Sequence, residues 1–184
     1  MDVGAHVGYF SLLAGRQDGP GGSVLSIEPN PVVLEQLRRN VERSRLRHVQ
    51  VVHTACGASH DAVRLYLHTE SNSSMASLSA QNATSGTAVD VPCTTLDDLC
   101  KERGIARVSL VKIDVEGAEL AVLRGMERVL REMRPVIVLE VEPHLLAGFG
   151  TSSESLVAFL GAHDYRVTSL GGHSNYVCHP GAVT

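Results

Sequence analysis

The feature that most constrains this chain is the stretch at residues 2–10, where Gly4 and Gly8 separate a short apolar segment from a helical pattern. A tight glycine loop between a buried strand and a helix is typical of parallel α/β sheets that bind a nucleotide-like ligand. Gly4 allows a sharp turn where a Cβ atom would clash, and Gly8 allows the helix at about 9–15 to lie close to the neighbouring strand. Such a loop presents backbone N–H groups and a helix N-terminus to its ligand.

The spacing of the glycines selects among nucleotide-like ligands. A dinucleotide fingerprint G-x-G-x-x-G that begins at Gly4 requires glycine at positions 6 and 9, where this chain has His6 and Tyr9. Side chains at these positions crowd a pyrophosphate. The pattern therefore disfavours NAD and FAD, and an NAD-dependent oxidoreductase stands only as a minor alternative. His6 is compatible with the loop because histidine is enriched among non-glycine residues with positive φ.

Strand and helix patterns alternate along most of the 184 residues, which predicts an α/β fold with a doubly wound, mostly parallel sheet in a single domain. The last two strands, at 165–170 and 175–178, are joined by a short turn containing Gly171 and Gly172, and we expect them to run antiparallel. The preceding strands are expected at 23–27, 49–52, 108–114 and 136–141, and the helices at 32–45, 95–104, 118–133 and 154–163.

Two regions depart from this alternation. Only Met1 precedes Asp2, although strands usually have about five or six residues, so we expect a truncated first strand and a natural chain that begins upstream. Residues 70–86 are rich in Ser, Asn and Thr, and strand-like alternation flanks them at 63–67 and 89–91. We interpret 70–86 as a mobile insertion, either a cover for the substrate or a disordered loop.

Acidic residues follow the predicted strands. Ligands bind beyond the carboxyl ends of the strands in an open parallel sheet, so Asp2, Glu28, Asp114 and Glu140 are expected to converge on one crevice. Glu28 lies twenty residues after Gly8, where a carboxylate can accept hydrogen bonds from both hydroxyls of an adenosine ribose. The alternative is that Glu28 is a surface residue capping the next helix.

Three blocks, DVGAHVG, IEPNP and KIDVEGAEL, resemble the motifs of the FkbM family of S-adenosylmethionine-dependent methyltransferases. The resemblance extends from Asp2 to at least Glu140. It implies the class I methyltransferase fold, a seven-stranded sheet with one antiparallel strand near the C-terminus. It also implies S-adenosylmethionine as cofactor and a hydroxyl-bearing small molecule, such as a sugar or a polyketide-type product, as acceptor. A cofactor-binding domain without activity is the main alternative.

The resemblance also implies which residues contact the cofactor. In this family the first acidic residue faces the amino-acid end of the cofactor, the loop wraps around it, and residues past the third strand lie along the adenine. The family usually carries asparagine where this chain has His6. The predicted cofactor-binding set is Asp2, Gly4, Ala5, His6, Gly8, Glu28, Pro29, Ala55 and Asp114.

Methyl transfer to an alcohol needs an acceptor oxygen that is aligned with the methyl group and relieved of its proton. Asp114 is predicted to orient the acceptor hydroxyl, or else to cap the following helix. Glu116 is predicted to hydrogen-bond the acceptor or the amino end of the cofactor, or else to place charge at that helix start. Glu140 either faces the substrate or is structural. His144, expected in a loop, is either a general base or a solvated residue.

Composition argues against several other classes of function. A net charge of −4 disfavours nucleic acid as a partner, and no apolar run is long enough to span a membrane. The four cysteines form no C-x-x-C pair, which predicts free thiols in a reducing cytoplasm and no zinc site. Carboxylates at the crevice suit Mg²⁺, but their spacing matches no compact metal motif, so no metal site is predicted.

Overall fold

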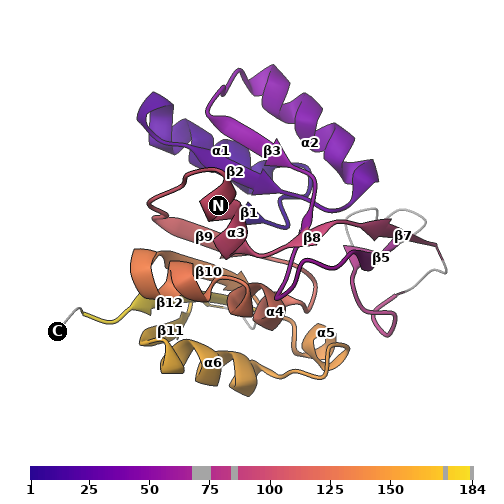
Figure 1. Ribbon diagram of the computed structural model, residues 1–184, viewed down its shortest axis with the longest axis vertical. Coiled ribbons are helices and arrows are strands. Elements are labelled where there is room, and N and C mark those ends of the chain that lie inside the picture. The colour runs from indigo at the N-terminus through magenta and orange to yellow at the C-terminus, as the bar shows by residue number, and fades with distance from the viewer. Residues whose placement is uncertain (68–75, 84–86, 172–173, 183–184) are drawn as a thin grey trace.

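Most of the strands belong to one sheet with the order β11-β12-β10-β9-β1-β2-β3 (Figure 1). The structure is a computed structural model that describes residues 1–67, 76–83, 87–171 and 174–182. The strands of this sheet are β1 (Asp2–Val3), β2 (Val24–Ile27), β3 (Val49–Val52), β9 (Leu110–Ile113), β10 (Val136–Glu140), β11 (Tyr165–Ser169) and β12 (Asn175–Pro180).

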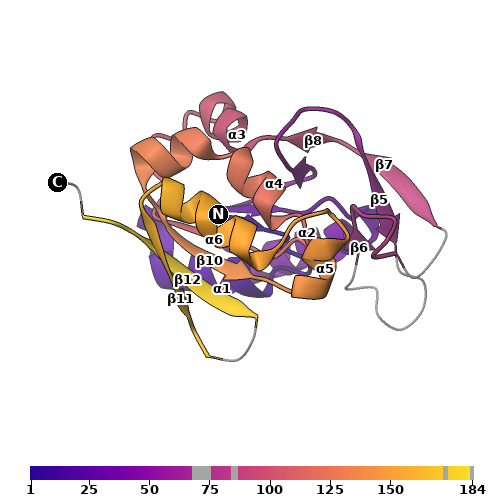
Figure 2. The same cartoon turned by 90° about the horizontal axis from the view of Figure 1, so that it is seen from below.

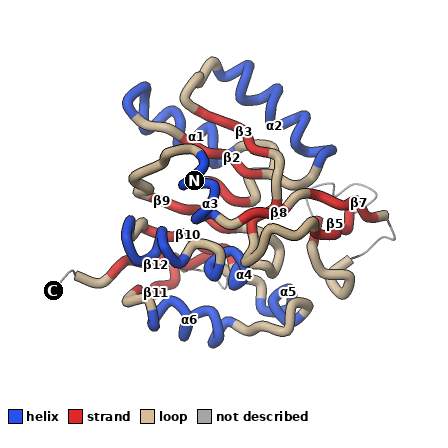
Figure 3. Tube along the Cα trace, viewed as in Figure 1, coloured by secondary structure: helices blue, strands red, loops and turns tan. Residues whose placement is uncertain are grey.

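The pairing of the strands confirms the predicted mixed sheet. All neighbours from β10 to β3 are parallel, whereas β12 is antiparallel to both β10 and β11. β12 is therefore the one reversed strand among the seven. Helices and strands, distinguished by colour in Figure 3, alternate along the chain from β1 to β3 and from β9 to β11, as the sequence pattern predicts.

β1 lies in the interior of the sheet, between β9 and β2, although it has only two residues. Asp2 is opposite Ser26 of β2 and Lys112 of β9, and Val3 is opposite Ile27 and Ile113. This interior position brings the glycine loop that follows β1 between the ends of β2 and β9. The loop can therefore contact residues at both strand ends.

Helices cover both faces of the sheet (Figure 2). Two separate apolar clusters reflect this arrangement: a large one that contains buried residues of α3, α4 and α6, and a smaller one around Leu34 and Leu37 of α2. The bounds of these helices are α1 (Tyr9–Asp18), α2 (Pro31–Ser44), α3 (Leu96–Glu102), α4 (Glu119–Arg124) and α6 (Ser153–Ala162). Within the described ranges, no helix is long and apolar enough to cross a membrane.

The single helix predicted at 118–133 is wrong, because the chain breaks there into α4 and a π-helical segment at Val129–Met133. The break lies at Gly125, where an added Cβ atom would be 1.9 Å from the carbonyl oxygen of Gly57. The Asp97 carboxylate accepts hydrogen bonds from the backbone N–H groups of Arg128 and Val129, at 2.8 and 2.9 Å. Long-range packing thus ends a helix that the local apolar pattern would continue.

The segment between β3 and α3 forms two small sheets. The strand-like pieces predicted at 63–67 and 89–91 are confirmed as β5 (Val63–Leu67) and β7 (Ala88–Val91), which pair antiparallel, and β6 (Ala76–Ser77) pairs with β5 on its other side. β4 (Ala55–Cys56) and β8 (Cys93–Thr94) pair parallel and connect this part to the main domain. Much of the insertion predicted to be mobile, 70–75 and 84–86, lies outside the described residues.

Candidate functional site

The glycine loop passes directly over the end of β9. Gly4 has φ +77°, and an added Cβ atom would be 1.8 Å from the carbonyl oxygen of Asp114. Only glycine fits this close approach. The N–H groups of Gly4 and Ala5 both donate to the carbonyl oxygen of Ile27, at 3.0 Å. His6 has φ 51°, so it occupies the left-handed region that the sequence suggested.

Glu28 connects this loop to the end of β2. Its Oε2 accepts from the N–H of His6 and its Oε1 from the N–H of Asn30, both at 2.8 Å. Burial raises the pKa of Glu28, and these two hydrogen bonds oppose the rise. Each carboxylate oxygen accepts more than one hydrogen bond, so Glu28 can still receive two hydroxyl groups of a ligand. Glu28 does not cap α2, because Asn30 accepts from Val32 at that position.

A pocket of about 300 Å³ opens beside the loop. Its walls come from the loop, the ends of β2, β9 and β10, the start of α1, and β4 to β6. The lining residues are Val3, Gly4, Ala5, His6, Val7, Tyr9, Phe10, Ile27, Glu28, Pro29, Asn30, Thr54, Ala55, Cys56, Leu65, Ala76, Leu78, Lys112, Asp114, Val115, Glu116 and Glu140.

Three acidic residues line the side of the pocket formed by β9 and β10. Oδ2 of Asp114 lies 3.0 Å from Nζ of Lys112. Burial raises the pKa of Glu140, and the charge of Asp114 and a hydrogen bond with its carboxylate raise it further. Burial, followed by the charges of Asp114 and Glu140, raises the pKa of Glu116 to about 7. At least one carboxyl group in this pocket therefore changes its charge near neutral pH.

The structure tests the capping alternatives for these acids. The N-cap of α4 is Ala118, and no side chain caps it. Oε1 of Glu119 instead accepts from the N–H groups of Gly117 and Val115, at 3.1 and 3.4 Å. The helix-capping role considered for Asp114 is therefore wrong, and its carboxylate faces Lys112 and the pocket.

Nine of the predicted site residues line one pocket, whereas Asp2, Gly8 and His144 do not. Asp2 is buried, and its Oδ2 accepts from the hydroxyl of Ser11 at 2.6 Å. Gly8 has φ +89°, and its added Cβ atom would be 2.5 Å from Leu37 of α2, so this glycine lets the loop lie close to α2. The nine lining residues are Gly4, Ala5, His6, Glu28, Pro29, Ala55, Asp114, Glu116 and Glu140.

His144 is not in a loop, because Pro143 begins the short helix α5 (Pro143–Ala147) and Leu145 and Leu146 bury its inner face. The His144 side chain is 71% exposed and pairs with Glu142 at 3.7 Å. His144 is therefore not among the residues that line the pocket.

Sequence reasoning missed several lining residues. Lys112 lies in an apolar strand pattern, and it comes close to buried Asp2 because β1 pairs with β9. Tyr9 and Phe10 begin α1 at the pocket mouth with exposed side chains. Leu65 and Ala76 come from the inserted strands β5 and β6, so this segment contributes a wall of the pocket. The sequence indicates part of this wall, since one interpretation of the insertion is a cover for the substrate.

Among the described residues, no group of three or more His, Cys, Asp or Glu side chains is arranged to hold a metal ion. The four cysteines are buried free thiols, as predicted. Burial raises the pKa of the Cys56 thiol beyond the range of a reactive thiolate, which agrees with the interpretation of Cys56 as a packing residue.

Comparison with protein families matches residues 2–167 to the methyltransferase FkbM domain. The chain belongs to the FkbM methyltransferase family. Among curated relatives of this FkbM chain, methyltransferase sdnD of Sordaria araneosa is 31% identical, over 78% of this chain and 66% of the relative. The 31-O-demethyl-FK506 methyltransferase FkbM of Streptomyces tacrolimicus is also 31% identical, over 69% of this chain and 58% of the relative.

Solved structures agree on the fold. The crystal structure of methyltransferase FkbM from Methylobacillus flagellatus KT superposes with a TM-score of 0.64 at 18% identity, covering 97% of this chain and 42% of that chain. This FkbM chain has the class I methyltransferase fold. It spans about 57–66% of the length of the first curated relatives that it matches.

S-adenosylmethionine is the cofactor that membership of the FkbM family indicates. The residues present fit it. Gly4, which has no Cβ atom to collide with the Asp114 carbonyl oxygen, lets the loop turn at the pocket, and Glu28 presents a buried carboxylate beside the loop for ribose hydroxyls. Ala55 and Leu65 supply apolar wall for a flat ring. The Ala55 N–H already donates to the carbonyl oxygen of Pro92 at 2.8 Å, so a contact with adenine would use its side chain.

Proposed function

We propose that this chain is an S-adenosylmethionine-dependent O-methyltransferase that acts on a hydroxyl group of a small molecule such as a sugar or a polyketide-type metabolite. One observation carries the proposal: the glycine loop and Glu28 line the same pocket as Asp114, Glu116 and Glu140. A cofactor held by the first group would meet an acceptor held by the second. The printed name of the FkbM relative, a 31-O-demethyl-FK506 methyltransferase, supports oxygen as the acceptor atom.

Each acid has a proposed role in the transfer. The cofactor supplies an electrophilic methyl group on a sulfonium, and the chain aligns the attacking oxygen and removes its proton. Asp114 orients the acceptor hydroxyl, because its carboxylate is held by Lys112 and lines the pocket. Glu116 accepts the proton, because a pKa of about 7 suits a general base at neutral pH. Glu140 supports both by sharing a hydrogen bond with Asp114.

The inserted segment is proposed to select the acceptor. Ala76 and Leu78 line the pocket, and the neighbouring residues dock onto α5. Ser79 Oγ donates to the carbonyl oxygen of Gly148 at 2.7 Å, and Asn82 Nδ2 donates to that of Leu145 at 2.9 Å. These bonds fix one wall of the pocket, so changes in this segment would alter which acceptors fit.

The first experiment is a thermal unfolding assay with S-adenosylhomocysteine and, separately, NAD. Ligand at a hundred times its dissociation constant adds about 2.7 kcal/mol to stability, which raises Tm by roughly 5–10 °C for a chain of this size. We expect this rise with S-adenosylhomocysteine and none with NAD. The absence of a rise with S-adenosylhomocysteine would contradict the proposal.

Two glycine variants make the assay specific. Gly4→Ala should abolish the ligand-induced rise, because its Cβ atom would collide with the Asp114 carbonyl oxygen at 1.8 Å. Gly104→Ala is the matched control, since Gly104 also has positive φ, +62°, but nothing lies within 4 Å of its added Cβ atom. Gly104→Ala should lower Tm slightly and keep the full ligand-induced rise.

A cofactor-binding domain without activity is a second candidate, because the chain spans only about 57–66% of the first curated relatives. Radiolabelled methyl transfer to a panel of sugar and macrolide alcohols distinguishes the two. Transfer to any acceptor establishes the enzyme. Ligand-induced stabilisation without transfer to any of them favours the binding domain.

A further inference from the structure

Lys112 lines the pocket, and its ammonium lies between the carboxylates of Asp2 and Asp114. It is 9% exposed, and its Nζ lies 3.0 Å from Oδ2 of Asp114 and 3.7 Å from Oδ1 of Asp2. The same ammonium lies 4.8 Å from the centre of the Phe10 ring, a distance typical of a cation–π contact. Of the described residues that line the pocket, Lys112 is the one lysine or arginine.

The surroundings of Lys112 need a positive charge. Asp2 is 4% exposed, and its Oδ1 has no hydrogen-bond donor within the described part of the chain, so the nearby ammonium is its compensation. A buried carboxylate without such a partner is strongly destabilising. The charge of Lys112 lowers the pKa of both Asp2 and Glu140, opposing the effect of burial in each case. One cation thus acts on carboxylates from β1 and β10.

The position of Asp114 also depends on Lys112. Glu119 accepts the backbone N–H groups at the start of α4, so these groups do not hold the Asp114 carboxylate. Its described polar contacts are with Lys112 and with Glu140, and Glu140 is itself an acid. Lys112 is therefore the positively charged donor that fixes this carboxylate in the pocket.

We propose that Lys112 is a positioning residue whose ammonium holds Asp114, on the acceptor side of the pocket, to buried Asp2 beneath the glycine loop. This arrangement sets where the acceptor hydroxyl binds relative to the cofactor. The inference rests on the proposed function. Charged and titratable groups face Lys112 from the loop, β1, the end of β9 and β10, namely His6, Asp2, Asp114 and Glu140.

The test combines three variants with a titration that needs no acceptor. Carboxyl carbons labelled with ¹³C are followed by NMR against pH, and the Glu140 signal is assigned with Glu140→Gln. Loss of the cation in Lys112→Met should move the Glu140 titration upward, because the Lys112 charge lowers the pKa of Glu140. Lys112→Arg, which keeps the charge, should titrate close to wild type. Lys101→Met is the matched control, because Lys101 is the other lysine of the chain and lies exposed in α3.

A Glu140 titration that is unchanged in folded Lys112→Met would overturn the inference. If Lys112→Met does not fold, the inference is tested by a titration of the wild-type protein. With ¹³C in the lysine side chains, only two lysines give signals, and that of Lys112 should move at the pH where Glu140 titrates while that of Lys101 does not. A Lys112 signal that does not move at the pH where Glu140 titrates would overturn the inference as well.

With an acceptor that turns over, the positioning role predicts a specific kinetic pattern. Lys112→Met should lower kcat by about tenfold or more, with a smaller effect on KM for the cofactor, and Lys112→Arg should recover part of the loss. Equal rates in wild type and Lys112→Met would contradict the role. Calorimetric binding of S-adenosylhomocysteine to wild type tests the proposed function separately, since its failure would leave the titration result intact.

Discussion

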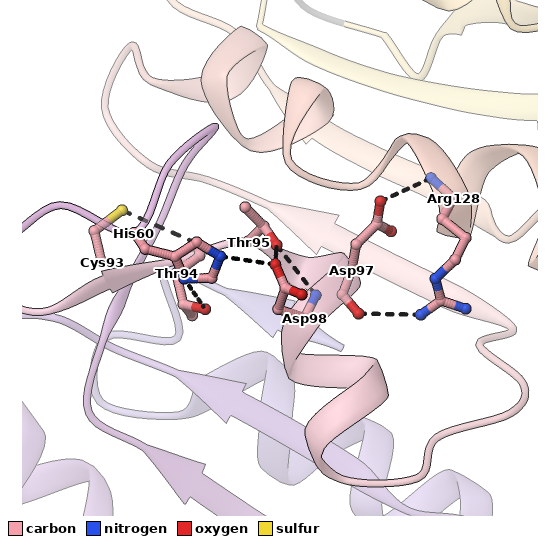
Figure 4. A network of polar contacts seen from close by, with 7 residues as sticks. All are labelled: His60, Cys93, Thr94, Thr95, Asp97, Asp98 and Arg128. Carbon is pink, nitrogen blue, oxygen red and sulfur yellow. Dashed lines mark hydrogen bonds and ion pairs between the residues drawn. The ribbon is translucent and has the colours of Figure 1, made fainter.

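The starts of helices α3 and α4 both follow a strand and both contain acidic residues, but their carboxylates have different partners. At α3 the acids have donors (Figure 4). Oδ2 of Asp98 accepts from the hydroxyl of Thr95 at 2.6 Å and contacts Nε2 of His60 at 2.8 Å. The two oxygens of Asp97 accept from the backbone N–H groups of Arg128 and Val129, at 2.8 and 2.9 Å. These acids join structural elements.

At α4 the acids lie beside one another, with the Lys112 ammonium 3.0 Å from Asp114. Only Glu119 accepts backbone N–H groups at this helix start, among the contacts that the structure describes. Asp114 and Glu116 line the pocket together with Glu140. Burial, followed by repulsion from the neighbouring acids, raises the pKa of Glu116 to about 7. The hydrogen bonds at α3 have the opposite effect, because they lower the pKa of Asp98.

This difference distinguishes acids that stabilise the fold from acids that are suited to chemistry. A carboxylate with donors is stable in its charged form and has little tendency to take up a proton. A carboxylate that is crowded by other acids in a pocket takes up a proton near neutral pH, as a general base must. Both regions share the same sequence pattern of acids at a helix start, so the pattern alone does not separate them.

The largest expected effect is that of Asp114→Asn on methyl transfer. The substitution keeps the shape of the side chain but removes the charge that Lys112 holds and that the acceptor hydroxyl would meet. We expect the rate to fall by about 100-fold or more, the range for loss of precise positioning of a reacting group. The measurement is kcat for transfer of a labelled methyl group to an acceptor found in the alcohol panel.

Asp98→Asn is the matched control for this prediction. Asp98 is also an aspartate that contacts a basic side chain, but it lies at the start of α3 and does not line the pocket. The control should keep the wild-type rate and the ligand-induced rise in Tm. A loss of rate similar to that of Asp114→Asn would mean that the two regions do not differ in the way proposed here.

Much of the site could be predicted because it depends on local features. The glycine loop has its own sequence signature, and the ends of parallel strands meet at one edge, so Asp2, Glu28, Asp114 and Glu140 are expected in one crevice. The structure brings Glu28, Asp114 and Glu140 together with Gly4 in the pocket lining, whereas Asp2 is buried against Ser11. The reversed strand was also predictable, because a short turn forces its neighbour to run antiparallel.

The features that the sequence did not reveal depend on contacts between distant residues. The role of Lys112 depends on the register of β1 against β9, which places it beside Asp2. The break after α4 depends on Gly125 lying against Gly57. The apolar periodicity of the helix gives no indication of this contact. His144 was considered as a base because its residue type suits that role, yet α5 carries it outside the pocket lining.

The pH dependence of Glu116→Gln tests the assignment of the base. Wild-type transfer should fall by about tenfold for each pH unit below about 7, because the protonated Glu116 cannot accept the acceptor proton. Glu116→Gln should lose this limb of the profile and have a lower maximum rate. A profile with the same limb in the variant would assign the base to another residue, with Glu140 the next candidate.

Stability gives a second test of Glu116 that needs no acceptor. Its pKa is raised in the folded protein from an ordinary value of 4.5 to about 7, so its contribution to stability is fully present below about 4.5 and is lost as pH rises through about 7. Glu116→Gln avoids the buried charge. The variant should therefore have a higher Tm than wild type at pH 8 and a similar Tm at pH 4. A lower Tm at pH 8 would contradict the raised pKa.

The smallest expected effect is that of Thr95→Ala, which removes the N-cap of α3. Oγ1 of Thr95 accepts from the backbone N–H of Asp98 at 3.1 Å, and the loss of such a cap costs about 1 kcal/mol. For a chain of this length Tm should fall by roughly 2–4 °C. Affinity for S-adenosylhomocysteine, measured by calorimetry, should not change, because Thr95 does not line the pocket. A weaker affinity would show that the hydrogen bonds at the start of α3 also support the pocket. The difference between the two helix starts would then be one of degree.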